Sequence, residues 1–267
     1  MKFDDLFPEQ SLNAYIADVF DGVHSGFSPS TDLFVATAEF LDSGLFEGYG
    51  QTLFDIDPDS LDAEMLRDLR DNVHVFSAFK SHHSAEQIGE LIWDGSGTKR
   101  PFNEFKADAM KMFHLTHDTH LKTEHRTSVA NGRSAAQWRD VVADADIFGF
   151  MKYETIGDER VRPEHENFDG ITRPIGDKFW RRHFPPNGFN CRCDVSRKTG
   201  LESGFEQTPT KVARRVPDPP ELFRMNAGID RVIFDPKHPA FTVADRFKVV
   251  AKNNFDLPLK FGKHSKT

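Results

Sequence analysis

The chain has 267 residues, of which 38% are hydrophobic and 28% charged, and its formal net charge is −8. This balance is typical of a globular protein with one large domain or two smaller ones. There is no run of about 18 apolar residues and no signal-peptide pattern at the acidic start, so we expect no membrane segment. Two cysteines one residue apart do not build a secreted disulfide framework, and we expect folding in a reducing cytoplasm.

The acidic balance argues against a general DNA-coating protein, which needs a basic surface. The aromatic content is unusual, with 26 Phe against 3 Tyr. Phe brings a large apolar area without a polar group, so the sequence predicts a Phe-rich core. Phe-rich helix faces are also candidates for a partner surface, because exposed apolar patches mark interfaces.

Apolar residues recur at helical spacing along the first eighty residues. This spacing predicts three helices. The first covers residues 8–24, the second begins at a cap on Ser30 and ends near Phe46, and the third begins at a cap on Ser60 and carries apolar residues to Phe79.

A fourth, separate helix is expected from Ser84, because Ser84 and Gln87 form a capping-box pattern. It ends near Gly95, where Gly-Ser-Gly-Thr reads as a linker. We therefore expect residues 1–97 to form an N-terminal helical region.

A long helix is predicted from about Phe102 toward Asn131 and Gly132, which would stop or bend it before another helix over 134–145. Histidines three residues apart share a helix face, which would permit a metal site. No cysteine or carboxylate pair completes such a site within the helix, so a solvated polar face is the preferred interpretation. The histidines are His114, His117, His120 and His125.

After residue 147 the pattern changes to alternating, aromatic and β-branched residues. It predicts a strand over 148–156 and a second short strand over 190–195. Together with the long helix, these strands would form a core segment over 98–200. The expected fold class is α+β, with an N-terminal helical region and a long helix followed by a small β-containing module.

Residues 201–267 read as a Pro-rich extension and a C-terminal tail. We expect residues 201–220 to be irregular, residues 232–234 to form a strand and residues 241–250 a helix. The final residues, 260–266, are basic.

The segment 153–196 holds both cysteines and an unusual density of special residues. Cysteines at i and i+2 on a strand point to the same side, where a disulfide between them would be strained. Two thiolates and an imidazole are good zinc ligands. One hypothesis is a structural zinc held by His165, Cys191 and Cys193, with His183 or an acidic residue as the fourth ligand, that stabilises an irregular segment.

The alternative is that no metal is bound. Free cysteines often act as small buried apolar residues, and His165 would then be a hydrogen-bonded core histidine. The spacing of one residue between Cys191 and Cys193 is also shorter than the usual spacing of zinc ligands. Cofactors therefore stay open, with none certain and a structural zinc as the hypothesis.

Other residues of this segment have structural interpretations. Pro186 and Gly188 flank an Asn in a turn signal, and Trp180 would fill a small core. Arg192 lies between the cysteines and would face the opposite side of a strand. It would pair with Asp158 or its neighbour Glu159, or meet a DNA phosphate or a partner.

These motifs together resemble the signature of the phage Mu F-like head morphogenesis proteins, also called minor head or minor capsid proteins. The motif residues include Asp158, Arg162, His165, Trp180 and Arg192. The matching runs are 153–158, 162–165, 169–170, 179–180, 185–188 and 191–193, which read YETIGD, RPEH, DG, FW, PPNG and CRC. A helical lead-in at 122–133 and the runs 223–228 and 238–239 also resemble the family, so the likeness covers roughly residues 100 to 240.

The resemblance implies a structural protein of a tailed phage or prophage, present in a few copies per head. Such proteins associate with the portal protein and other capsid or scaffold components, and act in head assembly or DNA delivery. The implied location is the virion, at the capsid interior or portal vertex, and the host cytoplasm during assembly. Local basic residues are candidates for contacts with packaged DNA or a partner: Arg181, Arg182, Arg214 and Arg215.

We expect binding rather than catalysis. The chain has no His-Glu-x-x-His motif, no Walker-type loop and no Gly-x-Ser-x-Gly elbow. A cysteine–histidine nucleophile is formally available. In a zinc hydrolase, Glu164 or Glu166 beside His165 would serve as general base. The alternative function is therefore a zinc-dependent nuclease or a toxin-like effector, although we see no spare C-terminal domain to carry a toxin.

Overall fold

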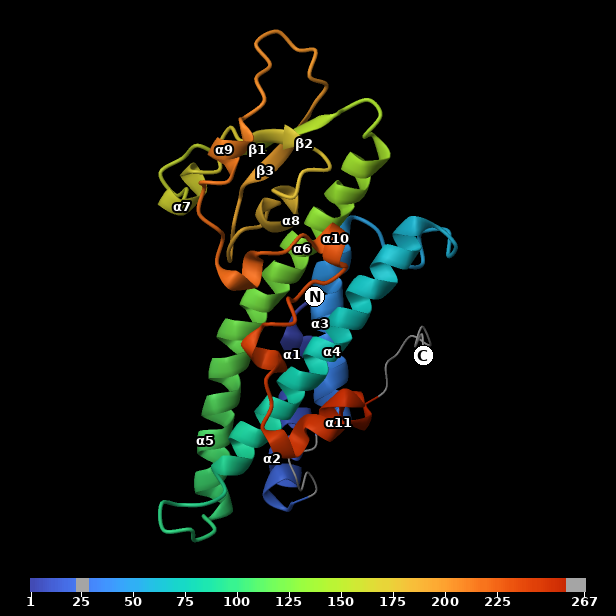
Figure 1. Ribbon diagram of the computed structural model, residues 1–267. Coiled ribbons are helices and arrows are strands. Elements are labelled where there is room, and N and C mark those ends of the chain that lie inside the picture. Colours follow the sequence, from blue (N-terminus) through green and yellow to red (C-terminus); the bar gives the residue numbers. More distant parts are fainter. Residues whose placement is uncertain (23–28, 258–267) are drawn as a thin grey trace. The chain divides into compact units, whose positions relative to one another are not determined.

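The computed structural model describes residues 1–22 and 29–257 (Figure 1). The described chain is mostly helical and contains a three-stranded antiparallel sheet, which confirms the α+β class. The expected helix end at 23–24 and the basic residues 260–266 lie outside the described residues. Among the described helices, none combines the length and apolar composition that a membrane span requires.

The chain divides into two compact units, each assembled from separate stretches of sequence. The first unit consists of Met1–Ser43, Arg70–His125 and His238–Thr267, and the second of Gly44–Leu69 and Arg126–Lys237. The division falls inside helices α3, α4 and α6. The units are therefore interleaved along the chain and do not coincide with the consecutive segments 1–97, 98–200 and 201–267.

The first unit is helical. Its main helices are α1 (Phe3–Leu6), α2 (Glu9–Phe20), the first part of α3 (Thr31–Tyr49), most of α4 (Leu61–Glu90), α5 (Phe102–Leu115), the π-helical turn η1 (Thr116–Leu121) and the start of α6 (Lys122–Ala143). The C-terminal part adds η3 (Pro239–Phe241), η4 (Asp245–Phe247), α11 (Lys248–Lys252) and η5 (Asn254–Asp256).

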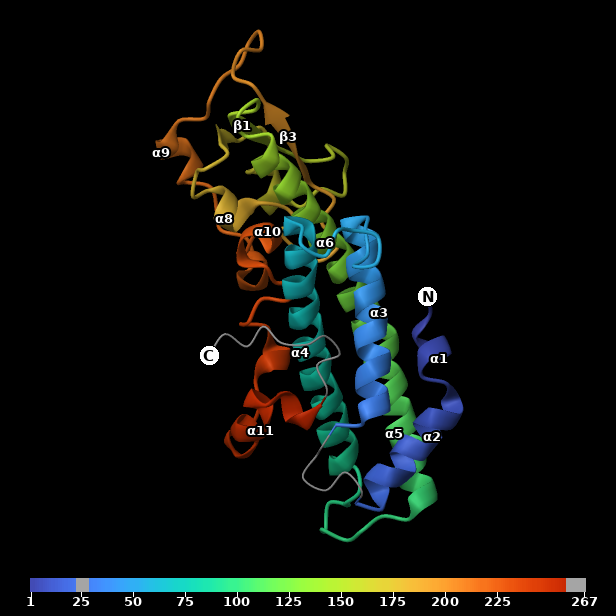
Figure 2. The ribbon, with the colours of Figure 1, turned by 90° about the vertical axis from the view of Figure 1, so that its right-hand side faces the viewer.

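Aromatic side chains form much of the core of the first unit. Helix α2 lies alongside α5 (Figure 2), and a buried cluster there includes Phe7, Tyr15, Phe105 and Phe113. The rings of Phe7 and Phe113 lie 5.8 Å apart. This confirms the predicted Phe-rich core. It also corrects the idea that these Phe-rich helix faces meet a partner, because the rings are buried within the unit.

The predicted helix starts are confirmed by their caps. The Ser30 hydroxyl accepts a hydrogen bond from the Leu33 N–H at 3.3 Å, and the Ser60 hydroxyl accepts one from Ala63 at 3.1 Å. Each cap satisfies a backbone donor that has no partner inside the first turn.

The predicted separate helix at Ser84 is wrong, because α4 runs without a break from Leu61 to Glu90. Ala85 and Ile88 are buried and extend the apolar face of the helix through the expected cap position. Serines tolerate this helix interior by hydrogen bonding to carbonyls one turn back, as Ser77 and Ser81 do.

Gly132 does not stop a helix either, because α6 passes through it. A Cβ on Gly132 would lie 2.6 Å from the Leu45 carbonyl oxygen, and a Cβ on Gly48 would lie 2.0 Å from that of Val129. The two glycines therefore allow the backbones of α3 and α6 to touch within the second unit. Asn131, the other half of the expected stop signal, donates to the Ile233 carbonyl at 2.7 Å.

The sheet belongs to the second unit and consists of β1 (Phe150–Glu154), β2 (Thr172–Pro174) and β3 (Asp194–Lys198) in the order β2-β1-β3. Met151 pairs with Arg173 on one side and with Arg197 on the other. The expected strand over 148–156 is confirmed as β1. The second expected strand begins later than residue 190, so both cysteines precede it, and β2 was not expected.

Short helices complete the second unit: α7 (Pro163–Glu166), α8 (Trp180–His183), α9 (Thr210–Ala213), η2 (Glu221–Phe223) and α10 (Ala227–Asp230). Helix α8 lies against the sheet (Figure 1), and Trp180 is fully buried in one cluster with Met151, Tyr153 and Val195. The Trp180 indole N–H donates to the Pro174 carbonyl at 3.0 Å.

The tail differs from the prediction. Residues 232–234 form no strand, because Ile233 and Phe234 are buried and the Ile233 carbonyl is bonded by an Asn131 side chain rather than by a neighbouring strand. The expected helix over 241–250 is divided into 3₁₀ turns and α11. The irregular stretch 201–220 contains the single turn of α9.

Candidate functional site

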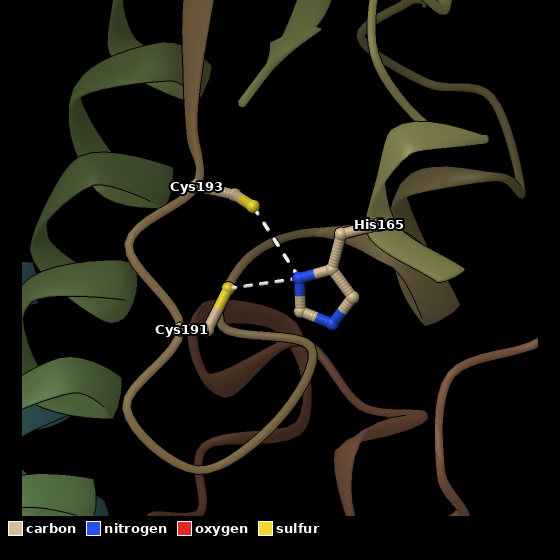
Figure 3. A group of neighbouring side chains, drawn as sticks. All are labelled: His165, Cys191 and Cys193. Carbon is tan, nitrogen blue, oxygen red and sulfur yellow. Dashed lines mark hydrogen bonds between the residues drawn. The ribbon is translucent and has the colours of Figure 1, made fainter. Parts of the chain in front are cut away.

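The second unit brings together three of the residues singled out from the sequence: His165, Cys191 and Cys193. Figure 3 shows the imidazole Nδ1 facing both sulfur atoms. Nδ1 lies 3.6 Å from the Cys191 sulfur and 3.4 Å from the Cys193 sulfur. The three potential ligand atoms all lie within 4.8 Å of one another.

Two loops supply these side chains. His165 is buried in the single turn of α7, which Pro163 begins, and the cysteines lie in the loop that leads into β3. The His165 ring lies roughly parallel to that of Phe168, with centroids 5.8 Å apart. The packing of α7 therefore fixes the direction of the imidazole.

Gly188 and Arg162 hold the two loops together. A Cβ on Gly188 would lie 3.0 Å from an Arg162 guanidinium nitrogen and 3.7 Å from Nε2 of His165. The Arg162 guanidinium donates a hydrogen bond to the Phe189 carbonyl. A glycine at position 188 thus lets the cysteine loop lie directly on α7, next to Pro186, which lines the adjoining cavity.

Tyr153 and Asn187 lie in two of the motif runs, but the sequence did not predict that they contact each other beside the cysteines. Both are fully buried, and the Tyr153 hydroxyl donates to the Asn187 amide oxygen at 2.8 Å. Burial raises the pKa of Tyr153, and the neighbouring Cys191 and Cys193 raise it further. The residue type could have indicated this contact, because a buried tyrosine in a chain that otherwise uses Phe suggests that its hydroxyl has a hydrogen-bond partner.

The two cysteines differ in the direction in which their surroundings shift the thiol pKa. A hydrogen bond from Cys193 lowers the pKa of Cys191 against the opposing effect of burial, and His165 and the backbone N–H of Asn187 lower it further. The same hydrogen bond, together with burial, raises the pKa of Cys193. Cys191 is therefore the sulfur that ionises first.

Arg192, between the cysteines, pairs with Asp158. Its guanidinium makes two hydrogen bonds of 2.6 Å to the carboxylate, in the bidentate arrangement that arginine favours. This hydrogen bonding lowers the pKa of Asp158 to about 2. Of the partners considered from the sequence, Asp158 is thus the one that Arg192 contacts.

A cavity of about 640 Å³ adjoins the cysteines within the second unit. Cys191 and Cys193 line it together with three arginines, Arg126, Arg133 and Arg192. Arg133 also donates to Asp194 at 3.2 Å. The cavity therefore brings solvent-accessible space next to the two cysteines, and two of its three arginines are paired with carboxylates.

His183, considered as a fourth ligand, lies elsewhere. Its ring nitrogens are 3.3 Å from the Phe179 carbonyl oxygen and 3.1 Å from that of Pro217. The ring stacks on Phe179, and burial lowers its pKa. His183 is not part of the group that His165 forms with the cysteines.

The basic residues expected to contact DNA differ in whether they form ion pairs with carboxylates. Arg181 pairs with Asp230 at 3.1 Å and Arg182 with Asp218 at 2.8 Å. Arg214 and Arg215 are exposed, and neither has an acidic partner within the described residues. Their charges are therefore available to an external anion.

The histidines of the long helix do not form a comparable group. His114 and His120 are exposed, as expected of a polar face. His117 is instead buried and stacked on Phe113 at 3.7 Å, and His125 lies 3.2 Å from the Ser43 hydroxyl. Over residues 1–22 and 29–257, His165 and the two cysteines are the group whose potential ligand atoms all lie within 4.8 Å of one another.

Fold and site together define an α+β module in which a histidine and two cysteines join two loops beside a small antiparallel sheet. Residues 86–196 match the family described as "Phage Mu protein F like protein". Residues 86–196 are thus similar to the Mu F-like family, which confirms the resemblance, and this segment includes all three residues of the group.

Two relatives support the match. The chain is 32% identical over 111 residues to "Putative capsid assembly protein F" of Escherichia phage Mu, which covers 42% of this chain and 24% of that protein. It is 26% identical over 108 residues to "Mu-like prophage FluMu F protein" of Haemophilus influenzae, covering 40% and 24%. The chain therefore matches about a quarter of each relative's length. No solved structure matches significantly.

Proposed function

We propose that this chain is a minor head protein of a tailed phage or prophage, which acts in head assembly by docking on the portal protein. The observation that carries the proposal is the Mu F-like segment at residues 86–196. The name of the phage Mu relative, a capsid assembly protein, supports the same role. Other capsid or scaffold components are further partners under this proposal, and the protein would be found in the virion.

The test is co-expression with the portal protein encoded in the same genome, followed by size-exclusion chromatography with light scattering. We expect a discrete complex of defined mass. A portal protein from an unrelated phage serves as the control and should not co-elute. If the folded chain, checked by circular dichroism, elutes free of its own portal, the docking proposal is wrong.

A contact with packaged DNA extends this proposal, and Arg214 and Arg215 are the residues that favour it. They are exposed, and among the described residues neither meets a carboxylate. Replacing both with Gln should weaken duplex DNA binding and reduce its salt slope by roughly one per arginine. Fluorescence anisotropy over a salt series measures both quantities.

Arg181 and Arg182 provide the matched control, because Asp230 and Asp218 already pair with them. Replacing this pair with Gln should change DNA binding much less. Salt-independent binding, or equal losses for both pairs, would contradict the DNA contact while leaving the portal result unaffected.

The catalytic alternative, a zinc-dependent nuclease or toxin-like effector, needs a general base beside the metal. Glu164 and Glu166 are exposed, whereas His165 between them is buried. Neither carboxylate belongs to the group of potential ligands. No specific observation therefore favours this alternative, and cleavage of plasmid DNA with added zinc is the result that would revive it.

A further inference from the structure

We propose that Nδ1 of His165 and the sulfurs of Cys191 and Cys193 bind one zinc ion, with a water molecule from the adjoining cavity as its fourth ligand. The site lies within the second unit, and the proposal does not depend on portal docking. Zinc is the chemical choice because two thiolates and an imidazole form a soft donor set that suits a tetrahedral ion.

The distances fit a ligand tetrahedron. With the usual Zn–S and Zn–N bond lengths, a sulfur and a nitrogen ligand on a tetrahedral zinc lie about 3.6 Å apart. The two sulfur–Nδ1 distances here are 3.6 Å for Cys191 and 3.4 Å for Cys193. Both sulfur–nitrogen distances therefore already lie close to the spacing that the ion requires, and all three atoms lie within 4.8 Å of one another.

Hydrogen bonding alone does not explain why both cysteine sulfurs lie next to Nδ1 of His165. An imidazole nitrogen has one in-plane position, which holds either a hydrogen or a lone pair. Both sulfurs nevertheless point at the same nitrogen of His165 (Figure 3). One ion between the three atoms satisfies all of them at once.

Charge and surroundings also suit the ion. Two thiolates neutralise the double charge of zinc, so the three nearby arginines of the cavity do not oppose it. Cys193 packs against the buried cluster that contains Tyr153, and Tyr153 is itself held by its hydrogen bond to Asn187. These contacts support the position of a proposed ligand, as the surroundings of metal ligands commonly do.

Water is the proposed fourth ligand because the described part of the chain places no further histidine, cysteine or carboxylate within 4.8 Å of all three ligand atoms. The cavity beside the cysteines, at about 640 Å³, is many times larger than the roughly 30 Å³ that one water occupies. A solvent ligand can therefore reach an ion bound by the sulfurs.

The consequence of binding is a clamp between two loops that contain little regular structure. His165 precedes Cys191 by 26 residues, and between them lie only the strand β2 and the single turn of α8. Metal binding would couple the ordering of these loops, since a metal site of this kind is absent from the unfolded chain.

The first test is the metal content of protein purified without a histidine tag, measured by inductively coupled plasma mass spectrometry. We expect close to one zinc per chain. His165→Asn, Cys191→Ser and Cys193→Ser should each lose most of it. Arg192→Gln and His183→Asn are the matched controls, which change the same loop or another buried histidine and should keep the metal.

Some ligand variants could fail to fold, so a second measurement uses the unaltered chain. The reduced protein is stripped with a chelator and titrated with Co²⁺. We expect the visible bands of a tetrahedral site and a sulfur-to-cobalt charge-transfer band. Addition of azide should shift the visible bands, because it displaces the proposed water.

Several outcomes would overturn the proposal. Less than roughly a tenth of an equivalent of zinc, both as purified and after reconstitution, excludes a site that is coupled to folding. An octahedral cobalt spectrum without sulfur charge transfer excludes the thiolate ligands, and equal zinc loss in His183→Asn excludes the ligand assignment. Visible bands that azide leaves unchanged would exclude the water.

Discussion

The helices of the first unit and the loops around His165 in the second unit are stabilised in different ways. In the first unit, many Phe rings share the burial, and Phe105 and Phe113 belong to one apolar cluster. In the loops of the second unit, a few directional contacts dominate, such as Tyr153 with Asn187 and Arg162 with the Phe189 carbonyl. Apolar burial distributes stability over many contacts, whereas the loops concentrate it on a few groups.

Removing the proposed metal gives the largest expected effect, because structural zinc in small peptides contributes about 10 kcal/mol or more to folding. Hydrogen–deuterium exchange before and after chelation measures it. We expect faster exchange of amides over 155–193 and no change in α2 and α5. If amide exchange became equally faster in both regions, the metal would not stabilise the loops specifically.

Phe105→Ala tests the apolar side of the comparison. Phe105 is fully buried, and its ring lies 5.0 Å from that of Phe20. The substitution should lower the free energy of unfolding by about 3–5 kcal/mol, because it leaves a cavity. Urea unfolding followed by circular dichroism measures this loss. Phe54→Ala is the control, since Phe54 is 92% exposed, and its effect should stay within about 0.5 kcal/mol.

Gly132→Ala tests the contact between α3 and α6. The added methyl would meet the Leu45 carbonyl at 2.6 Å, so the helix backbones must separate. We expect a loss of about 1–3 kcal/mol in unfolding free energy, although alanine favours a helix by about 1 kcal/mol over glycine. Gly95→Ala, where nothing lies within 4 Å, is the control. A stabilised Gly132→Ala variant would contradict the close contact.

Arg192→Gln has the smallest expected effect. The pKa of Asp158 is lowered from 3.8 to about 2, chiefly by its hydrogen bonds with Arg192. A lowered folded-state pKa stabilises the fold above about pH 3.8, and this contribution is lost as the pH falls through about 2. In the variant, the pKa of Asp158 should rise toward 3.8, as NMR titration of the carboxyl group would show.

Arg160→Gln is the control for that titration. Arg160 lies 3.7 Å from Asp158 and its side chain is 81% exposed, so its loss should move the pKa much less. Equal shifts in the two variants would mean that general charge, rather than the bidentate pair, lowers the pKa.

Local patterns predicted the helices well because periodicity and caps are local properties. Ser30 and Ser60 cap helices, as their sequence context predicted. Ser84 has the same local pattern but lies inside α4, where burial of Ala85 and Ile88 continues the helix. The local pattern at Gly132 predicts a stop or a bend, yet the role of this glycine depends on Leu45 in another helix, which no local pattern contains.

The sequence predicted the residues of the candidate site only in part, because residue type is a local property and spatial proximity is not. The chemistry of Cys191, Cys193 and His165 is visible from residue type, and the fold places them together. Sequence could not separate His165 from His183, because both are buried histidines in short helices and only the fold decides which one faces the sulfurs. The strand β2 was not predicted because a strand of three residues is too short to show an alternating pattern.

The interleaving of the two units limits how the chain can be dissected. A fragment that ends at residue 200 would lack the Ile233 carbonyl that accepts from Asn131. It would also lack Phe241 and Phe255, whose rings lie 5.4 and 5.0 Å from that of Phe79. Truncation after residue 200 would therefore remove core contacts from both units. Functions of this protein are better separated by point substitutions than by cutting the chain.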